Sequence, residues 1–235
     1  FGCVATRPLS LRSCPGSLII APPVLADPTL SSPYSVQLSA GAQGFSIEQA
    51  GASGSISNLS QADAVLAGTG RAWLVSTTAS NVNYRADASV EGNISGGRNF
   101  PIAGANEFAL RATAEILIPT SGVWTFGTNS DDGLRVRIDG ANVIVDDTLH
   151  AVADRYGQVT LSAGLHTLEL VFFEHGGTEA IELFAAQGNY NSFNSSFKLI
   201  GGTGGLEARR AGGTYTWSLT TGALPAGLTL DPASG

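Results

Sequence analysis

Several short clusters of side chains in this chain could carry chemistry. Asp131 and Asp132 place two carboxylates side by side, and the segment Glu174-His-Gly-Gly-Thr-Glu179 adds two more around a histidine and two glycines. Such carboxylates can hold a hard cation or work as acids and bases. Taken alone, however, the Asp-Asp-Gly sequence that begins at Asp131 favours a hairpin turn in which aspartate makes local hydrogen bonds.

Catalytic arrangements have less support. Glu174 and Glu182 have the residue types of a glycosidase pair, but nothing in the sequence marks a substrate cleft between them. The histidines are too far apart, and too differently placed along the chain, to indicate a zinc site. They are His150, His166 and His175. We therefore expect a binding or structural protein and not an enzyme.

The two cysteines, Cys3 and Cys14, form a close pair near the start of the chain. A bridge between them would contribute about 3 kcal/mol in the chain-entropy model. Such a pair, in an acidic chain with one lysine and no methionine, suggests an oxidising, extracytoplasmic location. The alternative is two free thiols at a disordered end. We expect the bridge, because no other nearby feature would hold this segment.

The composition predicts an all-β protein. Apolar residues make up 43% of the 235 residues and charged residues only 13%, while 30 glycines and 10 prolines interrupt the chain, which favours many short strands. The formal charge of -7 argues against a phosphate-binding nucleic-acid protein. No apolar run reaches the roughly 18 residues of a membrane helix. The chain starts at Phe1 without methionine, so we expect a processed product or a piece of a longer protein.

Regularly spaced strands must position the candidate side chains. A short helix is predicted at Ser60–Ala67, with Ser60 or Asp63 near its start, and a glycine-rich loop follows at Gly92–Ala105. Beyond it, alternation predicts strands at 108–118, 123–128, 134–138, 143–145, 156–161, 166–174 and 179–184. Asp139-Gly140 predicts a type I′ hairpin turn. No intervening helix is long enough for parallel crossovers, so we expect an antiparallel sandwich or barrel.

The string SGVWTFGTNSDDGLRVRIDG, residues 121–140, resembles the core of a PA14 domain. An Ala-Gly-Leu-His turn at 163–166, a strand ending in Phe-Phe-Glu at Glu174, and a Gly-Gly pair at 176–177 follow in the family's order. The resemblance covers roughly residues 45–207. It implies a PA14-like antiparallel β-sandwich in which Glu174 fits a framework position.

In sugar-binding members of this family, two consecutive aspartates, often joined by a cis peptide, bind calcium together with a second loop and hydroxyls of the sugar. The resemblance therefore implies that Asp131 and Asp132 bind Ca²⁺ and the ligand. A divalent ion would also explain two adjacent carboxylates that otherwise repel each other. The second loop is expected to supply the remaining contacts: Gly176, Gly177 and Glu179 to the ion and His175 to the sugar. By contrast, Asp146-Asp147 ends an exposed strand and indicates a solvated turn.

The two ends of the chain resemble two halves of a bacterial immunoglobulin-like repeat. Pro33–Ala40 resembles one of its strands, and Gly212–Gly235 resembles the turn and strand that follow. We expect a small, incomplete Ig-like β-sandwich of residues 20–40 and 212–235, interrupted by the PA14-like domain at 45–207. Residues 1–19 are then an N-terminal segment. The alternative is two partial repeats on either side of a separate domain.

These features predict a calcium-dependent carbohydrate-binding module of a secreted or cell-surface bacterial adhesin-like protein. Its expected partners are a glycan and neighbouring copies or further domains of a larger protein. The alternative is a structural subunit or spacer of an extracellular fibre or surface layer with no sugar ligand. In that case calcium would only stiffen a loop.

Overall fold

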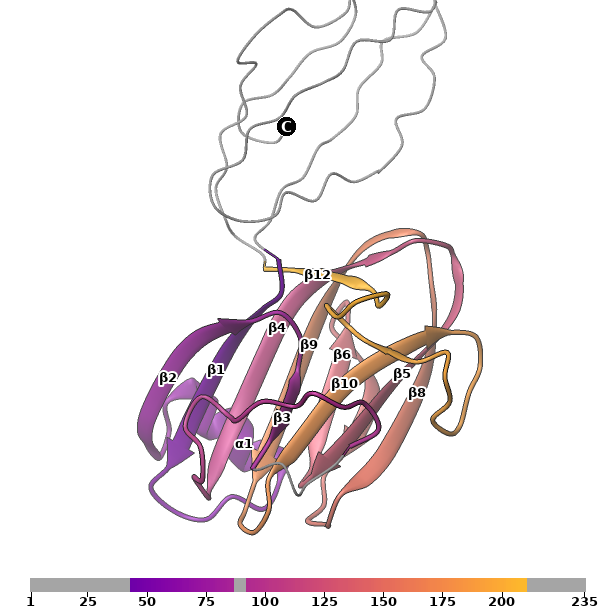
Figure 1. Cartoon of the computed structure of the whole chain (residues 1–235). Coiled ribbons are helices and arrows are strands. Elements are labelled where there is room, and N and C mark those ends of the chain that lie inside the picture. The colour runs from indigo at the N-terminus through magenta and orange to yellow at the C-terminus, as the bar shows by residue number, and fades with distance from the viewer. Residues whose placement is uncertain (1–42, 87–91, 211–235) are drawn as a thin grey trace, which may run out of the picture.

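The computed structural model describes residues 43–86 and 92–210 of the chain (Figure 1). They form two antiparallel sheets packed face to face, with one short helix, α1, on the outer side of the larger sheet. The all-β class and the antiparallel sandwich predicted from the alternating sequence are therefore confirmed.

The chain crosses repeatedly between the two sheets. The larger sheet has the order β2-β1-β4-β9-β6-β7, with β12 beside β4, and the smaller has the order β11-β10-β5-β8, with β3 beside β10. The strands are β1 Phe45–Ala52, β2 Arg71–Ala79, β3 Asn83–Arg85, β4 Phe108–Ile118, β5 Gly122–Asp131, β6 Leu134–Ile138, β7 Ala141–Asp146, β8 Ala153–Leu161, β9 Gly164–Glu174, β10 Ala180–Gln187, β11 Lys198–Leu199 and β12 Glu207–Arg209. Because β5 lies in the smaller sheet while β4 and β6 lie in the larger one, the chain changes sheets at both ends of β5.

The main core lies between the sheets because inward and outward side chains alternate along each strand. In β4, Leu110 and Ala112 point inward and are fully buried, whereas Arg111 and Thr113 belong to the outer face. Phe108 begins the same inward row and packs against other aromatic rings. Each large apolar side chain buried in this way stabilises the fold by about 1.5–3 kcal/mol.

Helix α1, Leu59–Ala67, covers one end of the outer face of the larger sheet. Its apolar side packs on outward-facing residues of the sheet: Leu59, Ala62, Val65 and Leu66 join Ala50, Ala109, Val171 and Phe173 in one cluster. Asn58 has extended backbone, and its Oδ1 accepts the Gln61 amide at 3.0 Å, as an N-cap does. The predicted helix is confirmed within one residue, but its cap is Asn58 and neither Ser60 nor Asp63.

Alternation does not predict β1, β2 and β3, whose residues are mostly small or polar. Gln49 of β1, for example, is polar and yet fully buried. Its side-chain oxygen accepts the Ile102 amide at 2.7 Å, and its side-chain nitrogen donates to the Ile102 carbonyl at 3.1 Å. The predicted hairpin is confirmed: Asp139 and Gly140 have φ angles of 50° and 79° and join β6 to β7.

The described chain enters and leaves the sandwich at one place. Gln43 pairs with Arg209 in an antiparallel bridge, the Gly44 amide donates to the Ala208 carbonyl at 2.8 Å, and Arg210 donates to the Gln43 carbonyl at 2.7 Å. Figure 1 shows the indigo start and the yellow end side by side. A domain with adjacent ends is suited to insertion into another domain.

The two expected Ig-like half-repeats, 20–40 and 212–235, lie outside the described residues and stay predictions. The same holds for the Cys3–Cys14 bridge. In the part of the chain that the structure describes, no helix is long and apolar enough to span a membrane.

Candidate metal centre

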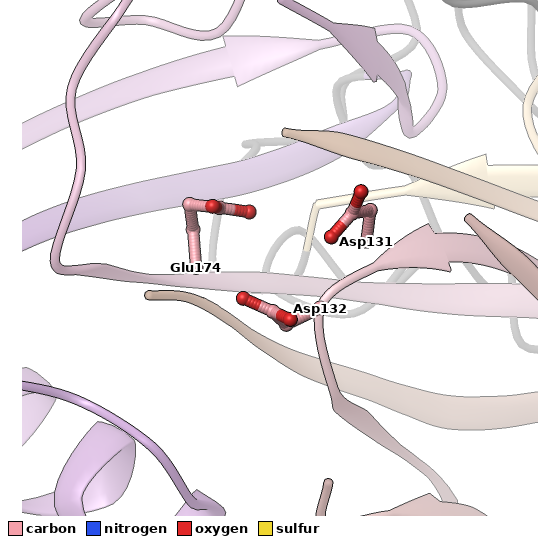
Figure 2. A group of neighbouring side chains, drawn as sticks. All are labelled: Asp131, Asp132 and Glu174. Carbon is pink, nitrogen blue, oxygen red and sulfur yellow. The ribbon is translucent and has the colours of Figure 1, made fainter. Parts of the chain in front are cut away.

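Three carboxylates meet at the end of the sandwich where β5 and β9 finish. Asp131 is the last residue of β5 in the smaller sheet, Glu174 is the last residue of β9 in the larger sheet, and Asp132 lies in the connection from β5 to β6. One oxygen atom of each carboxylate lies within 4.8 Å of the others. Figure 2 shows the three side chains gathered around a shared space.

Strand pairing brings these residues together from distant parts of the sequence. Asp131 lies opposite Ala180 of β10, and Glu174 lies opposite Phe108 of β4. Glu174 continues the inward row of β9, which includes Phe172, so its carboxyl group ends the core between the sheets. The sequence analysis assigns Glu174 only a framework position. The two-residue alternation of β9, which puts Glu174 on the same face as Phe172, is the sequence signal that could have placed it in the site.

The connection after β5 is tightly packed. At Gly133 a Cβ atom would lie 2.6 Å from both the Asp146 carbonyl oxygen and a ring carbon of Phe173, so only glycine fits there. The preceding peptide bond, between Asp131 and Asp132, is cis. This agrees with what the resemblance implies for the aspartate pair.

Asp132 holds two loops at the site. Its Oδ1 accepts the backbone amide of His150 and its Oδ2 accepts that of His175, each at 2.9 Å. The side chain is only 5% exposed, and charge-assisted bonds of this kind are among the stronger ones in proteins. Asp132 therefore fixes the loop after β7 and the loop after β9 relative to each other.

Glu174 is fully buried, and neither of its oxygens has a hydrogen-bond partner of normal geometry among the described residues. Burial, followed by the nearby charges of Asp132 and Asp131, raises the pKa of Glu174 to about 8, although the Gly176 amide offsets part of this shift. A buried carboxylate without a partner is costly to maintain, so a positive charge bound beside Glu174 would stabilise its ionised form.

Asp131 is less enclosed but is also affected by its neighbours. Burial and then the charge of Asp132 raise the pKa of Asp131 to about 6, while His150 and the Val152 amide act in the opposite direction. The arrangement thus concentrates negative charge at one end of the sandwich.

The other predicted ion ligands lie around this cluster. Glu179 is 2% exposed, and its carboxylate accepts the Gly104 amide at 3.2 Å while its carbonyl accepts the Ala86 amide at 2.8 Å. Its side chain therefore supports the 101–106 loop beside the three-carboxylate group. Gly176 and Gly177 lie on the exposed turn between β9 and β10. Ion binding by these three residues stays a prediction.

His175, the predicted sugar contact, lies on the rim of the site. Its side chain is 43% exposed, and Nδ1 is 3.1 Å from both the Ile56 carbonyl oxygen and a Glu107 carboxylate oxygen. The backbone of His175 is thus tied to the carboxylate cluster, whereas its ring is tied to the neighbouring 53–57 segment.

The solvated turn that the sequence indicates at Asp146-Asp147 is wrong for Asp146, which is buried, whereas Asp147 is exposed. Asp146 is 7% exposed, and its Oδ2 lies 2.9 Å from His150 Nε2 and 2.5 Å from Arg155 Nε. The Asp147 carboxylate accepts the Leu59 amide at the start of α1 at 2.5 Å. The period-two pattern of β7 does not reveal this burial, because the chain must first fold back after β7 to bring His150 and Arg155 onto Asp146.

A hollow of about 530 Å³ lies elsewhere, on the outer face of the larger sheet. It is open, most of its lining residues are polar, and the ion pair between Glu48 and Arg111 forms part of its lining. None of the predicted site residues lines it, so the carboxylate cluster remains the better candidate site.

The donor set of the cluster fits a hard divalent cation. Carboxylate oxygens are the ligands that calcium prefers, and neither oxygen of Glu174 has a hydrogen bond of normal geometry among the described residues. Within the described residues, no thiol or imidazole group joins the cluster, which argues against a zinc-type donor set.

The fold and site together define an antiparallel β-sandwich with a cluster of three carboxylates where β5 and β9 end. Residues 86–191 match the PA14 domain family. Among solved structures, the PA14 domain of the MpAFP antifreeze protein aligns with a TM-score of 0.52 and 17% identity over 66% of this chain and 86% of that one. The PA14 sugar-binding domain from an RTX adhesin aligns with a TM-score of 0.52 and 17% identity over 72% of this chain and 100% of that one. No curated protein matches the sequence significantly.

Residues 86–191 are thus similar to the PA14 family, as the resemblance of the aspartate string and its following motifs implies, and the sandwich has the fold of the two solved PA14 domains. The structural domain extends beyond the matched segment, because β1 and β2 complete the same sheet as β4 and β9.

Proposed function

We propose that this chain is a carbohydrate-binding module of a secreted or cell-surface adhesin-like protein, and that Asp131, Asp132 and Glu174 hold a calcium ion through which it binds a glycan. The observation that carries this proposal is the convergence of three carboxylates from two sheets, one of them fully buried and, among the described residues, without a hydrogen bond of normal geometry at either oxygen. Calcium, when bound, supplies a balancing positive charge and coordination positions for vicinal hydroxyl groups.

The chain's own residues have separate roles in this proposal. Asp131, at the partly exposed edge, faces the ligand side, and Glu174 closes the site toward the core. Asp132 orders the two loops that border the site through the amides of His150 and His175. The fold match to a domain described as sugar-binding supports the carbohydrate class.

The competing proposal is a structural spacer in an extracellular fibre, in which the same ion only stiffens the loops. The adjacent ends of the domain support it equally, since they allow insertion into a longer assembly. Calcium binding alone does not separate the two functions.

The deciding experiment is a glycan array probed with the full chain in calcium and again with chelator. We expect signals on a restricted set of glycans in calcium only, and their loss in Asp131→Asn. The matched control is Glu207→Gln, which changes an exposed carboxylate on β12, at the other end of the sandwich. A calcium-dependent rise in melting temperature without any glycan signal would favour the spacer.

A further inference from the structure

A second hollow, of about 400 Å³, lies on the outer face of the smaller sheet. One wall is the 93–95 turn, and the other is the segment 193–199 that leads into β11. It shares no lining residue with the carboxylate cluster. Its volume falls in the range of small-molecule sites.

The wall formed by Asn93 and Ile94 is anchored to two charged groups, of which Glu182 is buried and Asp154 is half-buried. The backbone amides of both residues donate to Glu182, at 2.8 and 3.2 Å, and the Asn93 side chain donates to Asp154 at 2.7 Å. Glu182 is 1% exposed and forms an ion pair with Arg85 at 2.6 Å. This wall is therefore preformed, which lowers the cost of ordering it around a ligand.

The base of the hollow is aromatic. Phe193 stacks on Phe197 with ring centroids 5.7 Å apart, and both rings meet Phe184 edge-on. Phe197 is buried, whereas Phe193 is partly exposed and lines the hollow. A partly exposed ring on a fixed aromatic base offers a contact surface for an apolar group.

The polar side of the hollow carries one charge. Lys198 is the only lysine of the chain and the only charged residue of the lining. Its Nζ donates to the Ser195 carbonyl at 2.9 Å, which occupies one of the three donors of an ammonium group. Three residues with hydroxyl groups, Ser95, Ser195 and Thr203, belong to the same lining. The hollow thus combines a cation and hydroxyl donors with an apolar base, on a chain of net charge -7.

We propose that this hollow is a second binding site, which takes a small organic anion with an apolar body, such as an aryl carboxylate. The ring of the ligand packs on Phe193 and Ile94, and its carboxylate accepts hydrogen bonds from Lys198 and a serine hydroxyl. The site does not depend on the calcium centre, and no covalent step is involved. For a ligand of about ten heavy atoms we expect a dissociation constant of about 1 mM.

Because Lys198 is the only lysine, reductive ¹³C-methylation labels this site and the N-terminal amine alone. Methylation keeps the positive charge. We expect phenylacetate to shift the Lys198 methyl resonance saturably, and the neutral isostere phenylacetamide to bind at least about tenfold more weakly. The N-terminal resonance is the internal control and should not move.

Two variants test the contacts separately. Phe193→Leu should weaken phenylacetate binding by about fivefold while the spectrum of the folded protein is retained. Lys198→Gln should weaken binding by about tenfold. Because this second variant has no lysine to label, its binding is measured by saturation transfer to the ligand. The proposal is overturned if phenylacetate gives no saturable shift, if phenylacetamide or plain acetate binds as well, or if both variants bind like the unmodified chain.

Discussion

Glu174 and Asp131 come from opposite sheets, yet their carboxylate oxygens lie within 4.8 Å of each other. Glu174 ends β9 in the larger sheet and Asp131 ends β5 in the smaller one. Like charges placed this closely destabilise the sandwich at the point where its two layers meet. A cation bound there would join the sheets, so stability and ion binding should be coupled.

The first prediction concerns Glu174→Gln. This change removes a buried ionisable group from the cluster without changing the shape of the side chain. In chelator at neutral pH we expect the variant to be more stable than the unmodified protein by about 1 kcal/mol, because the Glu174 carboxyl, whose pKa is raised to about 8, must take up a proton or hold a repelled charge when the chain folds, and glutamine need not. In calcium the order should reverse, since a ligand is lost. Urea denaturation in both buffers measures the two differences, and a variant less stable than the parent in chelator would contradict the account.

Asp131→Asn and Asp132→Asn should behave differently. Both should abolish most of the calcium-dependent stabilisation, which is about 2.7 kcal/mol for a ligand at a hundred times its dissociation constant. Only Asp132→Asn should also destabilise the chelated protein, by roughly 1–3 kcal/mol, because one amide oxygen cannot replace both acceptors for His150 and His175. Thermal unfolding with calcium and with chelator compares them. Equal losses in chelator would show that the two loop bonds contribute nothing.

The third prediction concerns acid stability. Burial raises the pKa of Asp139, but the hydrogen bonds from His166 and Thr167 have the larger combined effect. They leave the pKa of Asp139 below its ordinary value of 3.8. A lowered folded-state pKa contributes stability that is present above the unfolded-state value and is lost as the pH falls through the folded-state value. We therefore expect the unfolding free energy of the parent to fall more steeply below about pH 4 than that of Asp139→Asn. Asparagine tolerates the φ of 50° at this turn, so the hairpin is retained.

The control for this comparison is again Glu207→Gln, which should follow the parent curve. Equilibrium denaturation at several acidic pH values gives the slopes. Parallel curves for the parent and Asp139→Asn would refute the assigned role of the turn.

The fourth prediction concerns the two ends of the chain. Because Gln43 and Arg209 are paired, the segments before and after the sandwich start from the same place. We expect the residues around Val36 and Trp217 to share one small Ig-like sandwich. Nuclear Overhauser contacts between these two side chains in the labelled full chain would support this. Contacts confined to each segment separately would favour two partial repeats.

The sequence by itself determined the features that depend on neighbouring residues. Alternation predicts β4, β6 and β9, and the Asp139-Gly140 dipeptide specifies its turn, because strand period and turn chemistry act over a few residues. The string around Asp131 and Asp132 resembles the family whose model matches residues 86–191. Cap choice was less predictable, because Asn58, Ser60 and Asp63 can all accept a helix amide.

Only the tertiary structure decided which carboxylates share a site. Glu174 lies 43 residues beyond Asp131 and reaches it through the pairing of β9 with β4 and the packing of one sheet on the other. Glu179 is instead held by the Gly104 amide, and Asp146 is buried beside Arg155. Such contacts depend on strand register and burial, which involve residues far apart in the sequence. No local sequence pattern contains this information, because the electrostatic environment of a side chain is set by all the groups that the fold packs around it.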